Sequence, residues 1–329
     1  MFGEAVALAE ARGPALQGRS LLKLSDLDAG ELDEILRLAA YLKAHRLGPR
    51  LNLLAGKTVA MLFEKPSLRT RVSFEVAVHQ LGGDVLFAQG QEFMVGSRES
   101  PEDAARVLSR YAEAIVIRTH AHEPLVRFAL ASTVPVINGL SASAHPCQAL
   151  ADMLTIHERF GALRDLHIAY VGDGKNNVAV SLAEAAVLSG AHVHFGSPPT
   201  HRPAEAFLAH LQKLGKATGG SARAFGAAVR AVRGVDVVYT DVWTSMGDEA
   251  HSERNVALLR PFAVTSELMA YAAPHSIFMH CLPAHRGQEV TDAVMDGPRS
   301  AVFDQAENRL HAQKALLVAL LTDRKGILA

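Results

Sequence analysis

The amino-acid sequence predicts an α/β protein of two doubly wound domains, each with a central parallel sheet flanked by helices. Short apolar runs alternate with segments of helical periodicity along the chain, which is typical of parallel sheets covered on both faces. The length of 329 residues also exceeds the size at which one core stops growing, about 250–300 residues. We therefore expect a first domain over residues 1–144 and a second over 145–309, with the last helix, 310–329, packing back on the first domain.

In the first half, the expected elements alternate in the way that a parallel sheet requires. Ser25 is the expected N-cap of the first amphipathic helix, and Ser100 precedes Pro101 at the start of a later one. The apolar runs predict buried strands at 58–63, 84–87, 114–118 and 134–137, with helices after 67, after 100 and over 124–130.

The second half repeats this alternation after a loop of small residues at 138–144. A long helix that opens after His145 and runs through Phe160 is expected to join the two halves. Ligands of such sheets bind at the carboxyl ends of the strands, so residues that follow strands are the candidates for a site. The expected strands are 166–171, 192–195, 235–239, 276–279 and 301–303, and the expected helices are 177–189, 203–214 and about 307–321.

Composition and charge exclude several classes of protein. The apolar content of 49% is ample for a core, and a formal net charge of −1 argues against a nucleic-acid partner. Cys147 and Cys281 lie far apart and form no Cys-x-x-Cys motif, so we expect a reducing, cytoplasmic environment. No run reaches the roughly 18 apolar residues of a membrane span, and the amino-terminal segment does not resemble a signal peptide. We expect no membrane partner.

The stretch 63–75 predicts an anion site. It joins a buried strand to a helix start, where backbone N–H groups and the helix dipole favour negative charge. Ser67 and Thr70 add hydroxyl donors, while Arg69 and Arg71 add guanidinium forks that match phosphate or carboxylate oxygens. The alternative is that Ser67 only caps the helix and both arginines lie on a solvated face.

Other stretches that follow strands also carry polar side chains. Gly172-x-Gly opens a helix, but Asn177 replaces the third glycine of a dinucleotide fingerprint, so a nicotinamide-dependent dehydrogenase is a distant alternative. His145, with Gln148 three residues later, can donate a hydrogen bond to a carbonyl oxygen, or can be an ordinary loop or core residue. Asp241 at a strand end can pair with an amine or cap the next helix.

Two histidines and two cysteines raise the question of a metal site. His145, Cys147, His280 and Cys281 are zinc-ligand types, but their spacing matches no common zinc pattern. We therefore expect no metal and no cofactor. A buried, inert Cys281 is the alternative to a functional one.

With these residues in place, the chain resembles the transcarbamoylases over essentially its whole length. Ser67-Leu68-Arg69-Thr70-Arg71 is similar to the motif that marks the superfamily. The ornithine branch is distinguished by a Ser-Met-Gly loop and a His-Cys-Leu-Pro motif. The further matching pieces are His145-Pro146-Cys147-Gln148, Asp241 with Ser245-Met246-Gly247, His280-Cys281-Leu282-Pro283 and Glu307-Asn308-Arg309.

The resemblance implies a carbamoyl-phosphate domain over 1–144, an ornithine domain over 145–309, and a homotrimer, or a multiple of trimers, with active sites between subunits. It implies that ornithine is held by Asn177, Asp241, Ser245 and Met246. We expect the catalytic residues to be Arg69, Arg118, His145, Asp241 and Cys281. Carbamoyl phosphate would be bound by Ser67, Leu68, Arg69, Thr70, Arg118, His145, Gln148, Cys281, Leu282 and Arg309.

Two positions depart from the family pattern. Leu68 stands where the family usually has Thr, so one hydroxyl donor is missing. Met94 stands where relatives often carry a Gln or His that reaches a neighbour's phosphate site. Both bear on phosphate affinity rather than on the reaction. Leu68 is also similar to the acetylated-ornithine branch, which lacks the loop 245–247 found here.

The resulting hypothesis is direct attack of the side-chain amine of ornithine on carbamoyl phosphate, giving citrulline and phosphate. Phosphate is a good leaving group, so no covalent enzyme intermediate is required. Arg, Thr and His side chains would hold the carbonyl oxygen as it gains charge. The alternatives are a carbamoyltransferase for another amine (acetylornithine, putrescine or lysine) and a non-catalytic binding protein.

Overall fold

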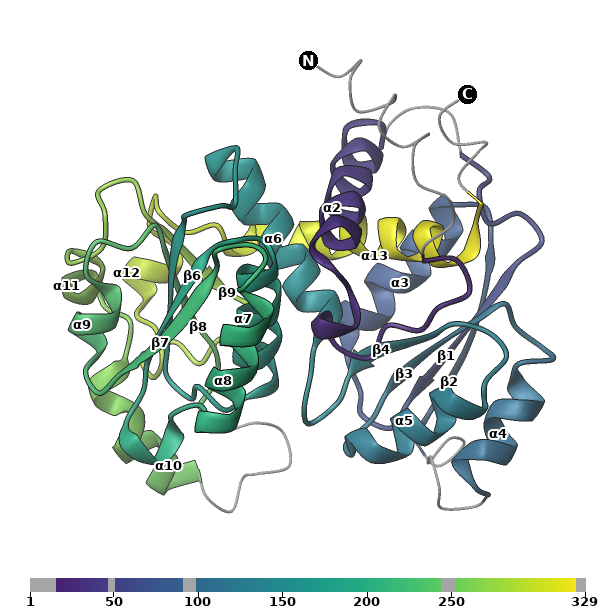
Figure 1. Cartoon of the computed structure of the whole chain (residues 1–329), viewed down its shortest axis with the longest axis horizontal. Coiled ribbons are helices and arrows are strands. Elements are labelled where there is room, and N and C mark those ends of the chain that lie inside the picture. The colour runs from purple at the N-terminus through teal and green to yellow at the C-terminus, as the bar shows by residue number, and fades with distance from the viewer. Residues whose placement is uncertain (1–15, 47–50, 91–98, 244–251, 324–329) are drawn as a thin grey trace. The chain divides into compact units, whose positions relative to one another are not determined.

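The structure is a computed structural model that describes residues 16–46, 51–90, 99–243 and 252–323, and it divides into two compact units (Figure 1). Unit 1 comprises residues 1–150 and 309–329, and unit 2 comprises residues 151–308. The division therefore falls after Leu150, whereas the sequence placed it after Ala144, and Arg309 belongs to unit 1.

Unit 1 contains a parallel sheet of four strands in the order β2-β1-β3-β4. Its strands are β1 (Thr58–Phe63), β2 (Asp84–Gln89), β3 (Ala114–Arg118) and β4 (Val136–Leu140). Its helices are α2 (Ala29–Ala44), α3 (Leu68–Gln80), α4 (Pro101–Leu108) and α5 (His122–Ala131), with α4 and α5 on the sheet face opposite α3 (Figure 1). The four strands that the apolar runs predicted in this half are confirmed, although β4 begins two residues later and extends into the expected loop.

Burial on both faces explains why the central strands of unit 1 are continuously apolar. All residues of β3 are buried, and in β1 only Thr58 is partly exposed. One face of this sheet packs against apolar side chains of α5, including Leu125 and Phe128. Parallel strands between two helix layers lack the polar alternation of half-exposed strands.

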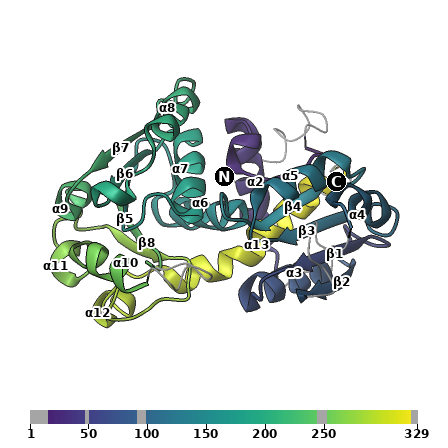
Figure 2. The same cartoon turned by 90° about the horizontal axis from the view of Figure 1, so that it is seen from below.

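Unit 2 contains a parallel sheet of five strands in the order β7-β6-β5-β8-β9. Figure 2 shows α7 and α9 on opposite faces of this sheet. Its strands are β5 (His167–Val171), β6 (His192–Gly196), β7 (Ser221–Phe225), β8 (Val237–Thr240) and β9 (Ile277–His280). Its helices are α7 (Asn177–Leu188), α8 (Glu205–Leu214), α9 (Ala228–Val232), α10 (Ser252–Leu259), α11 (Ser266–Met269) and α12 (Asp292–Met295).

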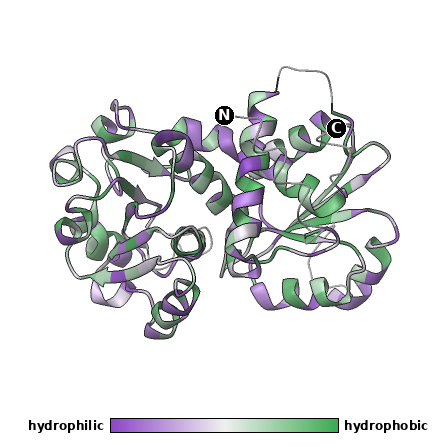
Figure 3. Cartoon of the chain, turned by 45° about the horizontal axis from the view of Figure 1, so that its top comes forward, coloured by the Kyte–Doolittle hydropathy of each residue, from purple (hydrophilic) through white to green (hydrophobic). Residues whose placement is uncertain are grey.

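Two long helices contribute residues to both units. They are α6 (Pro146–Phe160) and α13 (Val302–Leu321), which pass through the points where the chain is divided. In the part of the chain that the structure describes, short 3-10 helices cover Leu24–Asp26, Pro199–His201 and Arg260–Phe262. Figure 3 shows hydrophobic residues concentrated on the strands and on the inner sides of helices, in agreement with the buried residues of each core.

Two predictions about elements are wrong. The first amphipathic helix is capped by Asp28, not by Ser25, because Asp28 and Glu31 exchange side chain-to-backbone hydrogen bonds in a capping box. Residues 301–303 are not a strand: α13 begins at Val302, and every residue from 311 to 321 in this helix is buried. β7 and α9 were not predicted; each is only five residues long and contains an arginine.

Within the described residues, no helix combines the length and the apolar character that crossing a membrane requires.

Candidate active site

The strand order creates one reversal point in each sheet, and the candidate residues gather there. In unit 1 the chain moves outward in opposite directions from β1 and β3, and in unit 2 from β5 and β8. Ser67 follows β1 and Arg118 ends β3, while Asn176 follows β5 and Asp241 follows β8. Ligands of open α/β sheets bind at the carboxyl ends of strands beside such a switch point. Each unit therefore presents half of a candidate site.

The first half-site begins at the amino end of α3. Ser67 is the N-cap, and its hydroxyl accepts a hydrogen bond from the backbone N–H of Thr70 at 3.4 Å. Thr70 is buried, whereas Leu68 and Arg69 are exposed at the helix start. Arg71 instead pairs with Glu75 on the surface. The helix start thus combines the Ser67 cap with buried Thr70, and Arg69 is exposed beside them.

Arg309, from α13, ties this helix start to α6. Its guanidinium donates one hydrogen bond to the Gln148 side-chain oxygen at 2.6 Å and another to the Thr70 hydroxyl at 3.2 Å. All three residues are buried, and all belong to unit 1. The structure therefore brings Thr70, Gln148 and Arg309 together from three helices, as the resemblance implied.

His145 lies buried in the same positively charged environment. Burial, followed by the positive charges of Arg309 and Arg118, lowers the pKa of His145 well below its usual value. Arg118 is only 5% exposed at the end of β3. His145 is consequently neutral at physiological pH, so one of its ring nitrogens carries a hydrogen that it can donate without adding a charge.

Cys147, the neighbour of His145, is an inert residue. Its thiol is fully buried and donates to the backbone oxygen of Asn138 at 3.5 Å. Burial raises the pKa of the Cys147 thiol to about 12. A thiol that stays protonated is neither a nucleophile nor a metal ligand at neutral pH.

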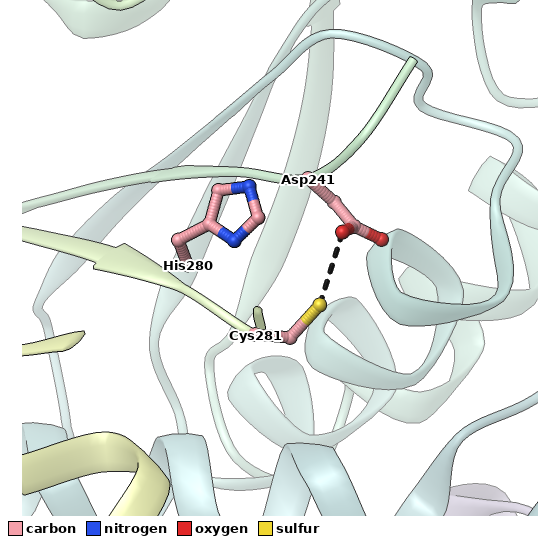
Figure 4. A group of neighbouring side chains, drawn as sticks. All are labelled: Asp241, His280 and Cys281. Atoms are coloured by element: carbon pink, nitrogen blue, oxygen red, sulfur yellow. Dashed lines mark hydrogen bonds between the residues drawn. The ribbon is translucent and has the colours of Figure 1, made fainter. Parts of the chain in front are cut away.

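The second half-site lies at the ends of two paired strands in unit 2. Thr240 of β8 pairs with His280 of β9, so the next residues, Asp241 and Cys281, emerge side by side. The Cys281 thiol donates to the Asp241 carboxylate at 3.0 Å (Figure 4). Asp241 is buried, and this burial raises the pKa of its carboxyl group, although His280 and the Cys281 hydrogen bond oppose the shift.

Asn176 completes this arrangement. Its side-chain oxygen caps α7 by accepting the N–H of Ala179 at 2.7 Å, and its amide group donates to Tyr170 at 2.7 Å and to Asp241 at 3.2 Å. Asn177, the residue singled out from the sequence, is half-buried as the first residue of α7. The sequence signal that could have identified Asn176 as a site residue is its position as an N-cap. A residue that caps a helix start also faces the loops around the strand ends.

His280 fixes the backbone that follows Cys281. The backbone N–H of Leu282 donates to His280 Nδ1 at 2.9 Å, so the hydrogen of the neutral ring is on Nε2, which lies 3.4 Å from the buried Glu289 carboxylate. The backbone N–H of His280 donates to Gln305 at 2.9 Å. Leu282 has a φ of 59°, a left-handed conformation that needs such local support. Sequence reasoning did not identify Glu289 or Gln305 as neighbours of this motif.

The group formed by Asp241, His280 and Cys281 has the donors to hold a cation. One ligand atom from each residue lies within 4.8 Å of the others (Figure 4). A carboxylate and a polarisable sulfur, partly screened from water, also suit the nitrogen of an amine. Ser245 and Met246 lie outside the described residues, as does Met94.

Comparisons with known proteins match each half of the chain to a different domain of one family. Residues 19–158 match the carbamoyl-P binding domain, and residues 164–320 the Asp/Orn binding domain, of aspartate/ornithine carbamoyltransferase. The chain belongs to this family.

Individual relatives are similar over nearly the full chain. The ornithine carbamoyltransferase of Symbiobacterium thermophilum is 50% identical over 93% of this chain and 99% of its own length. The anabolic ornithine carbamoyltransferase of Pyrococcus furiosus is 49% identical over 93% of this chain and 98% of its own length. A solved structure of ornithine carbamoyltransferase from Pyrococcus furiosus matches with a TM-score of 0.90 at 49% identity, covering 93% of this chain and 98% of that one.

Proposed function

We propose that this member of the carbamoyltransferase family transfers the carbamoyl group of carbamoyl phosphate to the side-chain amine of L-ornithine, giving L-citrulline and phosphate. The observation that carries the proposal is the buried cluster of unit 1, in which neutral His145 lies in the field of Arg118 and Arg309. Such a cluster suits a small dianion that also has a carbonyl oxygen to polarise.

The donor half-site acts by positioning and electrostatics. Ser67, Thr70 and the N–H groups at the start of α3 bind phosphate oxygens, with Arg69 beside them. The guanidinium groups and the hydrogen of neutral His145 stabilise the carbonyl oxygen as the amine attacks. The remaining donor ligands in this proposal are Leu68, Gln148, Arg118, Arg309 and the backbone of Cys281 and Leu282.

The acceptor half-site orients the amine of ornithine. An alkyl ammonium group titrates near ~10.4 in water and must lose a proton before it can attack. Asp241, backed by Cys281 and Asn176, accepts the amine N–H and points the nitrogen lone pair at the carbonyl carbon. Asn177, Ser245 and Met246 are the other proposed ornithine ligands. The catalytic residues of the proposal are Arg69, Arg118, His145, Asp241 and Cys281.

A panel of amines tests the choice of acceptor. Acetylornithine blocks the α-amine, putrescine lacks the α-carboxylate, and lysine adds one methylene, so each differs from ornithine in one feature. With carbamoyl phosphate as donor, we expect kcat/KM for ornithine to exceed each of the others by at least about a hundredfold. Formation of the carbamoylated product from another amine with the highest kcat/KM would identify a carbamoyltransferase of different specificity.

The variant Arg69→Ala tests whether the donor half-site is catalytic. We expect loss of activity by about two or more orders of magnitude, because a charged hydrogen-bond donor to the reacting group is removed. Arg37→Ala is the matched surface control, since Arg37 only forms an exposed pair with Asp33 on α2. Equal activity of the two variants would contradict a catalytic role for Arg69 and favour a binding protein.

We further propose that the chain forms a cytoplasmic homotrimer. Support comes from exposed apolar side chains in unit 1: Leu68 and Val72 on α3, and Leu86 on β2. β2 is the end strand of its sheet, a place where proteins seldom leave apolar side chains uncovered. Both cysteines carry free thiols, which suits a reducing compartment.

A further inference from the structure

Three histidines cluster at the amino edge of the unit 2 sheet, the edge opposite Asp241 and Cys281. His167 opens β5 and pairs in register with His192, which opens β6, and His194 follows two residues later on the same face. The His167 ring lies 4.9 Å from the His192 ring and 5.2 Å from the His194 ring, measured between centroids. All three side chains are half-buried, so solvent reaches them.

The backbone of α9 fixes the tautomer of His194. His194 Nδ1 lies 3.1 Å from the backbone oxygen of Ala231, and because a carbonyl oxygen only accepts, Nδ1 must carry the hydrogen. In the neutral ring, Nε2 then carries the lone pair. Without a metal it accepts a hydrogen bond from His167 Nδ1, 3.4 Å away. Among the described residues, these two nitrogens have no other hydrogen-bond partner.

This geometry matches the spacing of two ligands on one metal ion. Metal–nitrogen bonds of about 2.0–2.1 Å at a tetrahedral angle separate two imidazole nitrogens by about 3.3 Å. We propose that His167 Nδ1 and His194 Nε2 form a two-histidine site for a borderline divalent cation such as Zn²⁺ or Ni²⁺, with water completing the coordination. The hydrogen of the neutral His167 ring would then be on Nε2, so binding requires no net loss of a proton.

Neighbouring groups orient the two histidine rings, and nearby charges affect how strongly the site would bind a cation. The bond from His194 Nδ1 to a backbone carbonyl is the outer contact that usually orients a metal-bound histidine. The His192 ring packs on His167, and its Nε2 lies 3.8 Å from the exposed carboxylate of Asp165. Arg223 on β7 acts on His194 in the opposite sense, as a positive charge that repels a cation. The site should therefore bind imidazole-preferring metals rather than Mg²⁺ or Ca²⁺.

The test must separate this site from the Asp241, His280 and Cys281 group. Calorimetric titration with Zn²⁺ alone is therefore done on a Cys281→Ser background, which lacks the thiol ligand. We expect one saturable equivalent per chain. On that background, His194→Asn should weaken binding by at least about tenfold, since loss of even an outer partner of a ligand costs about 10–100-fold. Circular dichroism checks that the variant is folded, and His167→Gln replaces it if it is not.

Two further variants sharpen the result. His157→Asn is the control, because His157 is an exposed histidine of unit 2 on α6, and it should leave the affinity unchanged. Arg223→Gln removes the opposing charge and should tighten binding several-fold. Absence of saturable binding on the Cys281→Ser background, or an unchanged affinity in folded His194→Asn or His167→Gln, would overturn the proposal.

Discussion

His145 illustrates how its surroundings select one protonation state of a side chain. Its ring is buried, and two guanidinium groups act on it from α13 and from the end of β3. Both effects disfavour the imidazolium form, which would add a third positive charge to the cluster. A neutral ring can donate to a carbonyl oxygen while the arginines supply the charge for phosphate. The burial of the donor half-site therefore also keeps the His145 ring neutral, as its proposed role as a hydrogen-bond donor requires.

This protonation state has a measurable effect on stability. As pH falls through the unfolded pKa of about 6.5, the unfolded chain binds a proton that native His145 rejects, so the free energy of unfolding decreases. We expect His145→Gln to remove this contribution, worth up to about 1.4 kcal/mol per pH unit. Urea denaturation at pH 7 and pH 5.5 should show a smaller decrease for the variant than for the parent.

The control for this comparison is His157→Gln, because His157 is an exposed histidine of α6. It should follow the parent at both pH values. A decrease in stability that is the same in His145→Gln as in the parent would mean that His145 is not held neutral.

Residue chemistry predicted the donor half-site better than the acceptor half-site. Ser67 and Thr70 could be found because a strand, a turn and a helix start are adjacent in sequence, and the structure places them at the start of α3. Asn176 and Asn177 could both be placed at a helix start, but which of the two caps α7 depends on where the helix begins, and only the structure shows that it is Asn176. Glu289 reaches His280 only through the fold, so local patterns carry no sign of it.

At the scale of elements, hydrogen bonds at helix starts decide where helices begin. α2 starts one residue after Asp28, whose carboxylate accepts the N–H of Glu31 at 2.8 Å, while Glu31 accepts the N–H of Asp28 at 2.9 Å. Ser25 lies in the 3-10 turn before it. Serine and aspartate are comparable N-caps by propensity, so the reciprocal partner three residues later settles the choice.

Removing this cap should cost about 1 kcal/mol. We expect Asp28→Ala to lower the free energy of unfolding by that amount in urea denaturation, because the N–H of Glu31 loses its acceptor. Asp33→Ala is the control within α2, since its exposed pair with Arg37 is worth only about 0.3–0.5 kcal/mol. The assignment of the cap would be wrong if Ser25→Ala proved more damaging than Asp28→Ala.

Strands with a continuous apolar sequence were predicted correctly. Elements whose sequence is only partly apolar, or fits both a helix and a strand, were missed or assigned wrongly. β1 and β3 are buried on both faces, so their sequences read as strands without further context. β7 is an edge strand with no fully buried residue, and its sequence carries little signal. The apolar residues 301–303 were predicted as a strand, although they lead into α13, a helix whose later turns are buried on all sides. A short apolar run does not by itself distinguish a strand from a segment of a buried helix.

At the scale of the whole molecule, two units of similar design carry different chemistry. Each has a parallel sheet with one reversal point, and candidate residues lie at that point in both. Unit 1 presents guanidinium groups and a neutral imidazole, whereas unit 2 presents a buried carboxylate and a thiol. The chain divides between the units within α6 and α13, and Arg309 opens the α13 segment assigned to unit 1. The last helix therefore contributes to the donor half-site as well as to the core.

The exposed apolar side chains of unit 1 predict the assembly of the chain. Leu86 is 50% exposed on β2, the end strand of the sheet, and we propose that a second copy covers it. We expect Leu86→Asp to shift the mass measured by light scattering from a trimer toward a monomer, because a charge buried in an interface is costly to desolvate. Leu130→Asp is the matched control: Leu130 is 82% exposed on α5, not on β2. A parent chain that is monomeric at every concentration, or equal masses for the two variants, would refute this interface.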